Sequence, residues 1–106
     1  MSEQIMTKLF EVIKSRQGAP GQESYTASLF AKGDNKILKK IGEELTELIM
    51  AAAVRDDLNT VYECADVLFH MLVLLAHRGI DLESVFAELE RRMGKSGLVE
   101  KAERKK

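Results

Sequence analysis

The sequence contains little cysteine, proline or aromatic residue, and each scarcity excludes a class of structure. One cysteine, Cys64, cannot form a disulfide framework within the chain or a zinc site built from cysteines. A single thiol suits a reducing compartment, and we expect a cytoplasmic protein. The only proline is Pro20, so no later proline interrupts a long helix.

The chain also lacks an excess of charge of either sign and a long apolar run. Sixteen Lys and Arg residues oppose 17 Asp and Glu residues, and the net charge of −1 does not indicate a nucleic-acid binder. The longest apolar run, 71–76, is far shorter than the roughly 20 residues that span a bilayer. The first residues do not resemble a signal peptide. We therefore expect neither nucleic acid nor a membrane as a partner.

The length and overall composition predict one folded domain. The chain has 106 residues, of which 45% are hydrophobic and 31% are charged, an ordinary balance for a soluble protein. We expect a single domain over residues 1–106. Its last part, from about 94 to 106, is a basic tail that is either helical or frayed.

Apolar residues recur with helical spacing through most of the chain, and no stretch alternates with the period of a strand. The pattern predicts a helical stripe within 5–13, a turn at 17–21 and helices over 24–31, 35–54, 58–77 and 82–92. In the predicted helix over 35–54, one face carries Ile37, Leu38, Ile41, Leu45, Leu48, Ile49 and Ala52. We predict an all-α fold, a bundle of about four to five helices.

Several residues are placed to begin or end these helices. Asp34, Asp57 and Asp81 stand at expected N-cap positions, and Gly79 stands just beyond the end of the helix over 58–77. The second half of that helix is apolar almost all round. A chain of this size has little room to bury such a helix, so we expect it in a bundle centre or at an oligomer interface. We predict a four-helix-type core completed by homodimerisation.

Two acidic pairs lie on neighbouring predicted helices. Glu44 pairs with Glu47, and Glu63 pairs with Asp66, each at i, i+3 on one helix face. The connection between the helices is short, so they should be antiparallel, with the two pairs facing each other. Four converging carboxylates repel one another, and a hard divalent cation such as Mg²⁺ relieves that repulsion.

The same residues permit a simpler interpretation. Acidic residues on helix flanks are commonly solvated or paired with lysine four residues away, as Lys40 and Glu44 are spaced. The chain would then be a non-catalytic helical dimerisation module. We expect Cys64 to be packed and inert and His70 to be a hydrogen-bonded group at the edge of the core, outside the metal's ligands.

The acidic pattern also matches a known one. Glu-Glu-x-x-Glu at 43–47, followed by Glu-x-x-Asp at 63–66, resembles the signature of the all-α nucleoside-triphosphate pyrophosphohydrolases, the MazG-like superfamily. Within it, nearly the whole chain resembles the phosphoribosyl-ATP pyrophosphatases of histidine biosynthesis. The more specific matches are Ser-Tyr-Thr at 24–26, the lysines at 36 and 40, and Gly-Lys-Ser-Gly at 94–97.

The resemblance implies a reaction and a ligand set. The reaction is the hydrolysis of phosphoribosyl-ATP to phosphoribosyl-AMP and pyrophosphate with Mg²⁺. Glu44, Glu47, Glu63 and Asp66 would be the Mg²⁺ ligands. Glu43 would be a further ligand, a group next to the ligands, or the base that orients the attacking water.

The resemblance also implies substrate contacts and partners. Lys36 and Lys40 would hold the triphosphate, Tyr25 and Thr26 would contact the nucleotide, and Lys95 and Ser96 would bind phosphate. A homodimer is expected, and phosphoribosyl-AMP cyclohydrolase, which is sometimes fused to this domain, is a possible partner. An alternative within the superfamily is the hydrolysis of free or modified dNTPs to clean the nucleotide pool. The segments 24–26 and 94–97 favour phosphoribosyl-ATP.

Overall fold

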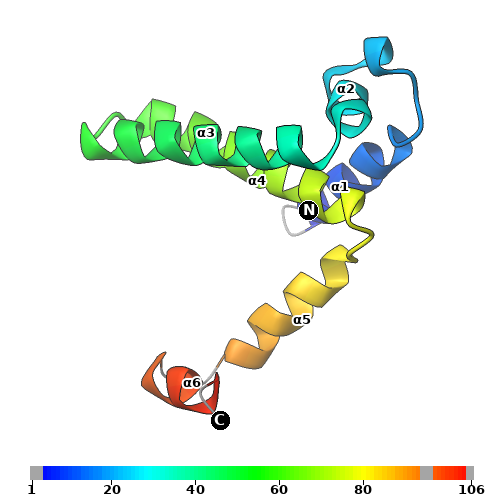
Figure 1. The fold of residues 1–106 in the computed structure, drawn as a ribbon. Coiled ribbons are helices and arrows are strands. Elements are labelled where there is room, and N and C mark those ends of the chain that lie inside the picture. The colour runs from blue at the N-terminus through cyan, green and yellow to red at the C-terminus, as the bar shows by residue number, and fades with distance from the viewer. Residues whose placement is uncertain (1–3, 94–96, 105–106) are drawn as a thin grey trace.

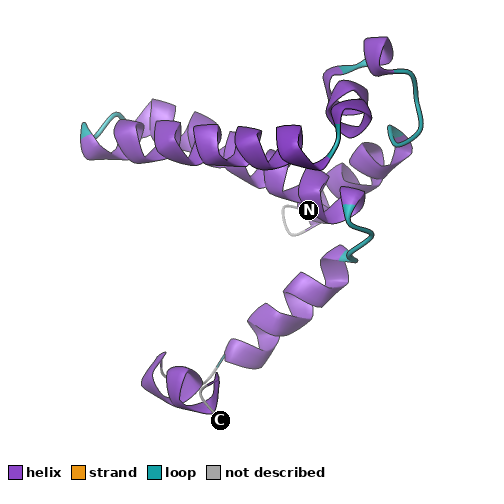
Figure 2. Cartoon of the chain, viewed as in Figure 1, coloured by secondary structure: helices purple, strands orange, loops and turns teal. Residues whose placement is uncertain are grey.

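The computed structural model describes residues 4–93 and 97–104, and this part of the chain is helical nearly throughout, without a strand (Figures 1 and 2). The helices are α1 (Ile5–Ser15), a short 3₁₀ helix η2 (Gly21–Glu23), α2 (Tyr25–Lys32), α3 (Asp34–Ala53), α4 (Asp57–His77), α5 (Leu82–Arg92) and α6 (Gly97–Arg104). The all-α prediction is confirmed, and the predicted helix over 24–31 is present with a boundary shift of one residue at each end.

The long helices α3 and α4 form an antiparallel hairpin that organises the molecule (Figure 1). Their sequences predict this arrangement, because each is long, free of proline and joined to the other by three residues. Helices α1 and α2 pack against one end of the hairpin, whereas the end that contains the α3–α4 turn extends beyond them (Figure 1).

Two predicted N-caps are wrong by one residue. Asp56, and not Asp57, caps α4, because its Oδ1 accepts a hydrogen bond of 3.1 Å from the backbone N–H of Asn59. Asp34 lies inside the first turn of α3, and Gly33 occupies the cap position with φ of 89°. Glycine adopts this left-handed backbone without strain, so one residue ends α2 and begins α3.

Other caps agree with the prediction. Asp81 caps α5 by accepting a hydrogen bond of 3.1 Å from the backbone N–H of Glu83. Gly79 follows α4 with φ of 67°, as expected of a residue at a helix C-terminus. Displaced from the cap, Asp34 instead accepts two hydrogen bonds from Arg78, at 2.9 and 3.1 Å, which join the start of α3 to the end of α4.

The hydrophobic core lies where α1, α2, the start of α3 and the second half of α4 meet. Its fully or almost fully buried side chains are Phe10, Ile13, Leu29, Ile37, Leu72, Val73, Ala76 and Leu82. The second half of α4 thus contributes Leu72, Val73 and Ala76 to the core, whereas Leu68 and Met71 on its other side are 40% and 46% exposed. One side of this half is therefore buried in the single chain, and the predicted oligomer interface stays a prediction for the other side.

Several apolar side chains that the periodicity places on a buried face are exposed in the chain. On α3, Leu38, Leu45 and Ile49 are 42%, 41% and 67% exposed. On α5, Leu89 is 52% exposed, because this helix leaves the bundle at an angle and only its first residue, Leu82, is buried (Figure 1). The sequence pattern identifies these residues as apolar but does not say which surface covers them.

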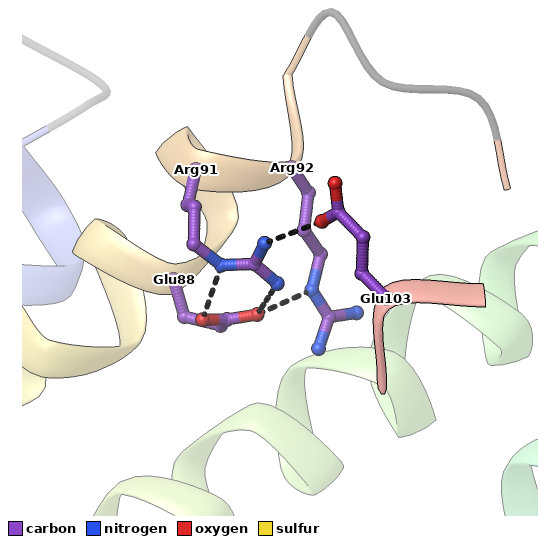
Figure 3. A network of polar contacts seen from close by, with 4 residues as sticks. All are labelled: Glu88, Arg91, Arg92 and Glu103. Carbon is purple, nitrogen blue, oxygen red and sulfur yellow. Dashed lines mark hydrogen bonds and ion pairs between the residues drawn. The ribbon is translucent and has the colours of Figure 1, made fainter. Parts of the chain in front are cut away.

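A polar network connects α5 with α6 (Figure 3). Glu88 accepts hydrogen bonds from Arg91, at 2.7 and 3.1 Å, and from Arg92, at 2.9 Å. Arg91 also forms an ion pair of 3.9 Å with Glu103 of α6. The part of the tail that the structure describes, 97–104, is helical.

By length and composition alone, α4 is the one helix in the described part of the chain that could cross a membrane. The core helices of soluble proteins meet the same criterion. This helix also carries the carboxylates of Glu63 and Asp66 in its first half.

Candidate metal centre

Three of the four predicted metal ligands meet between α3 and α4. Carboxylate oxygens of Glu44, Glu63 and Asp66 lie within 4.8 Å of one another. Glu63 and Asp66 are one turn apart on α4, and the antiparallel hairpin brings Glu44 of α3 opposite them. The cluster therefore follows directly from the spacing within each helix and the register of the hairpin.

The cluster is enclosed enough for its polar atoms to lose water. Glu44 is 6% exposed and Glu63 is 9% exposed. Among the described residues, Oε2 of Glu44 and Oε1 of Glu63 are buried and have no hydrogen-bond partner. Such atoms destabilise a fold unless a partner satisfies them. A hard divalent cation coordinated by oxygen is such a partner, so the residues present fit Mg²⁺.

The pKa values of two carboxyl groups in the cluster are raised, as expected where negative charges crowd together without enough positive charge. Burial raises the pKa of Glu63, and the nearby charges of Glu47, Glu44 and Asp66 raise it further. Burial likewise raises the pKa of Asp66, with a further contribution from the carboxyl group of Glu44, whereas His70 and Lys40 act against the shift. The carboxyl groups around Glu63 and Asp66 thus make these two residues harder to ionise.

Lys40 supplies positive charge beside the cluster. Its Nζ lies 3.4 Å from Oε1 of Glu44 and 3.6 Å from Oε1 of Glu43. Burial alone would lower the pKa of Lys40, but the surrounding groups, first among them Tyr25 and Glu44, outweigh burial and the pKa is raised. Lys40 is therefore a permanent cation at the edge of the carboxylates.

Two other predicted acidic residues lie around this cluster without belonging to it. Glu47 is exposed and is not among the three converging carboxylates, but its charge acts on Glu63. Glu43 is exposed as well and faces Lys40. A cavity of about 400 Å³ opens next to the cluster and is lined by Glu47, Met50, Ala51, Val54, Asn59 and Glu63.

Of the residues predicted to contact the substrate, some lie near the acidic cluster and others lie outside the described part of the chain. Tyr25, at the start of α2, donates to or accepts from His70 of α4 across 2.8 Å, so it reaches the edge of the acidic cluster. Thr26 follows it and is partly buried. Lys36 lies one turn before Lys40 on α3 and is also partly buried. Lys95 and Ser96 lie outside the described residues.

The sequence profile of the phosphoribosyl-ATP pyrophosphohydrolase family matches residues 6–93. The chain belongs to this family. The matched region extends from the second residue of α1 to the end of α5 and includes all three carboxylates of the cluster. The matched region ends before Lys95 and Ser96, so it gives no support to either residue.

Individual relatives in the family are similar over almost their full length. Proteins named phosphoribosyl-ATP pyrophosphatase from Trichlorobacter lovleyi and Geobacter metallireducens are 53% and 52% identical to this chain. The alignments cover 98% and 96% of this chain and 96% and 94% of the relatives. A protein of the same name from Geobacter sulfurreducens is 54% identical over 94% of this chain and 93% of its own length.

Two features of this family member differ from, or go beyond, what its sequence predicts. Cys64 is exposed and not packed, because it lies 100° around α4 from Glu63, on a side that no described helix covers. The contact between Tyr25 and His70 links residues 45 positions apart, and no periodicity within either helix indicates it. Its only sequence signal is the position of His70 one turn after Asp66.

Proposed function

We propose that this chain hydrolyses phosphoribosyl-ATP to phosphoribosyl-AMP and pyrophosphate with Mg²⁺, a step of histidine biosynthesis. The observation that carries the proposal is the convergence of Glu44, Glu63 and Asp66, with two buried oxygen atoms unsatisfied, in a chain of this family. When bound, Mg²⁺ would neutralise phosphate charge and favour ionisation of a water molecule.

The carboxylates divide into two groups in this proposal. Glu44, Glu63 and Asp66 hold the cation directly, because they already converge. Glu47 completes the set from the exposed side, where it lies next to Glu63 and lines the neighbouring cavity. An exposed ligand suits the face that the substrate's phosphates must approach.

Glu43 is proposed to act on the attacking water. Its carboxylate is exposed and lies 3.6 Å from Lys40, so it is next to the cluster without sharing the cation's buried site. From there it can accept a hydrogen bond from a water molecule and orient it toward a phosphorus atom. Cys64, the one thiol, has no partnered base, so direct attack by water is the simplest route.

Positive charge for the triphosphate is assigned to Lys36 and Lys40. Both lie on the same flank of α3, one turn apart, and the ammonium group of Lys40 is already beside Glu44. Tyr25 and Thr26 are proposed to contact the nucleotide from the start of α2. Lys95 and Ser96 are proposed to bind phosphate, on the strength of the sequence pattern alone.

A homodimer is proposed because the single chain is too open for its size. Its radius of gyration is 16.0 Å, whereas a compact chain of this length has about 13 Å. Its accessible surface is 7631 Å², against roughly 6,000 Å² for a folded monomer of this mass. Large apolar side chains stand on the open part of the hairpin, namely Leu45, Ile49, Met50, Val54, Leu58, Val61 and Tyr62. A second copy would cover this apolar stripe.

The cellular setting is proposed on the same basis. A cytoplasmic location agrees with the single exposed thiol and with an enzyme of amino-acid biosynthesis. Association with phosphoribosyl-AMP cyclohydrolase is proposed because that enzyme uses the product. In this proposal neither a nucleic acid nor a membrane is a partner.

The deciding experiment measures pyrophosphate release from phosphoribosyl-ATP and from a panel of NTPs and dNTPs, with Mg²⁺ and with EDTA. Asp66→Asn is the test variant, and Glu90→Gln, an exposed residue on α5, is the matched control. We expect turnover of phosphoribosyl-ATP that requires Mg²⁺ and is lost only in Asp66→Asn.

Other results would replace this proposal. Turnover of dNTPs alone would retain the carboxylate chemistry and make the protein a nucleotide-pool cleaning enzyme. No pyrophosphate release from any nucleotide, by the wild type or by Asp66→Asn, would favour the non-catalytic dimerisation module.

A further inference from the structure

Tyr25 and His70 make a polar contact that the metal ligands do not explain. Oη of Tyr25 lies 2.8 Å from Nε2 of His70, and Nδ1 of His70 lies 2.7 Å from the backbone carbonyl oxygen of Asp66. His70 is 2% exposed, whereas Tyr25 is 50% exposed. A buried imidazole at the acidic cluster is thus connected to a phenol that a ligand can reach.

The backbone carbonyl determines which nitrogen of His70 carries the proton. A carbonyl oxygen only accepts hydrogen bonds, so Nδ1 must donate to Asp66. In a neutral imidazole Nε2 is then an acceptor, and the single hydroxyl hydrogen of Tyr25 points to it. The lone pairs of the Tyr25 oxygen are left for a hydrogen-bond donor.

Ring packing holds the phenol in this orientation. The ring of Tyr25 stacks on Phe69, with centroids 6.4 Å apart and planes at 25°. The ring of His70 is nearly perpendicular to both, with centroids 5.8 Å from Tyr25 and 5.2 Å from Phe69. Ser24 caps α2 by accepting a hydrogen bond of 3.0 Å from Ala27, which fixes the backbone next to Tyr25. The hydroxyl therefore has a defined place.

The phenol also stays protonated in these surroundings. Burial raises the pKa of Tyr25, and the carboxylates of Glu44, Asp66 and Glu43 add to this, while Lys40 opposes it. Its hydrogen is thus present to be donated at neutral pH.

We propose that His70 is a positioning residue that makes the Tyr25 oxygen a hydrogen-bond acceptor for a donor group of the substrate. A hydroxyl or amino group of the nucleoside part fits this oxygen, because phosphate oxygens only accept. The inference rests on the proposed function, and it deepens the assignment of Tyr25 by specifying which part of the nucleotide it contacts.

Three variants separate this role from a structural one. Tyr25→Phe removes the acceptor. His70→Asn keeps an amide N–H near the position of Nδ1 but does not reach Tyr25, whereas His70→Gln places an amide oxygen near the position of Nε2. We expect Tyr25→Phe and His70→Asn each to raise KM about three- to tenfold, as for one lost hydrogen bond, with kcat within about twofold.

The combination of variants is the critical measurement. Tyr25→Phe with His70→Asn should raise KM no further than either change alone, and His70→Gln should restore KM to within about twofold of the wild type. An unchanged KM in His70→Asn, multiplied effects in the double variant, or no recovery in His70→Gln would each overturn the proposal.

A second measurement does not depend on turnover. Nitrogen NMR of protein labelled at histidine should show His70 protonated at Nδ1 and unprotonated at Nε2, with His77 as the second signal in the same chain. Tyr25→Phe should shift the Nε2 resonance of His70. A protonated Nε2 would contradict the proposal, whereas absent hydrolysis by the wild type would contradict the proposed function instead.

Discussion

At the scale of the residue, Glu44 combines a helix interior position with almost complete burial. Its carboxylate shares a space with Glu63 and Asp66, and the ammonium group of Lys40, on the same helix, lies 3.4 Å from it. One ammonium group does not balance three carboxylates. The residue is therefore expected to weaken the metal-free fold and to strengthen the metal-bound one.

Replacing Glu44 with Gln tests this double effect. We expect the metal-free variant to be at least as stable as the metal-free wild type, because one of three mutually repelling carboxylates is removed while Lys40 keeps Glu43 as a partner. We also expect Mg²⁺ to stop raising Tm and turnover to fall at least about 100-fold, since a ligand is lost. Thermal unfolding with Mg²⁺ and with EDTA measures the first two effects. A variant that still gains stability from Mg²⁺ would exclude Glu44 as a ligand.

The raised pKa values of Glu63 and Asp66 predict how stability depends on pH without metal. Their ordinary values are 4.5 and 3.8, and both are higher in the folded chain. The folded state then binds more protons than the unfolded state. The two carboxyl groups therefore stabilise the fold at pH values below their ordinary pKa, and this stabilisation is lost as pH rises through their raised pKa values. The free energy of unfolding in EDTA should fall over that range.

Urea unfolding at a series of pH values checks this prediction. The comparison is with Glu63→Gln combined with Asp66→Asn, which should remove this part of the pH dependence and leave the rest of the chain's titration in place. Identical pH profiles for the wild type and the double variant would contradict it. Stabilisation by Mg²⁺ should also grow as pH rises, because cation and proton compete for the same oxygens.

At the scale of the element, α3 and α4 end in the same type of turn, but the residue in the left-handed position differs. After α4, Ile80 N–H donates to Leu75 and Gly79 takes φ of 67°. After α3, Asp56 N–H donates to Ala51 at 3.1 Å and Arg55 takes φ of 60°. Both are Schellman-type endings, but only the first has glycine at the left-handed position.

Arg55→Gly should therefore stabilise the protein. Relief of the left-handed strain exceeds the entropy that glycine adds to the unfolded chain, and we expect a gain of about 0.5–1 kcal/mol in the free energy of unfolding. Gly79→Ala is the matched opposite change and should destabilise by about 1 kcal/mol or more. Urea midpoints of the two variants measure both effects. A loss of stability in Arg55→Gly would show that the arginine side chain contributes more than its backbone strain costs.

The same turns show what the sequence can and cannot predict. Gly79 is predictable as a helix end because glycine is the common solution there. The cap at Asp56 is not separable by sequence from one at Asp57, because both are aspartates and the strained Arg55 shifts the turn by one residue. Similarly, the spacing of Glu44, Glu63 and Asp66 predicts their meeting. The contact of Tyr25 with His70 depends on how α2 packs on α4, which no local pattern specifies.

At the scale of the whole molecule, the exposed apolar stripe and the large surface area lead to one prediction about assembly. Ile49 and Val61 are 67% and 70% exposed on the facing helices of the open hairpin. In a homodimer these side chains would be buried, where a lysine is strongly disfavoured. Ile49→Lys or Val61→Lys should therefore give a monomer.

Light scattering after size exclusion measures this directly. Val12→Lys, at a residue of α1 that is 49% exposed and lies outside the apolar stripe, is the matched control and should remain dimeric. A wild-type protein that is monomeric at all concentrations would exclude the homodimer. Dimeric Ile49→Lys and Val61→Lys would place the interface elsewhere on the chain.

The unsatisfied oxygens of Glu44 and Glu63 have a consequence for the lifetime of the protein in the cell. If Mg²⁺ clamps α3 to α4, then its loss favours opening of the hairpin, and an opened hairpin offers its backbone to proteases. Scarcity of the cation would then lower the amount of protein as well as its rate of reaction. In extracts depleted of Mg²⁺, the wild type would be degraded faster than in extracts with Mg²⁺, whereas the degradation rate of Glu44→Gln would not change.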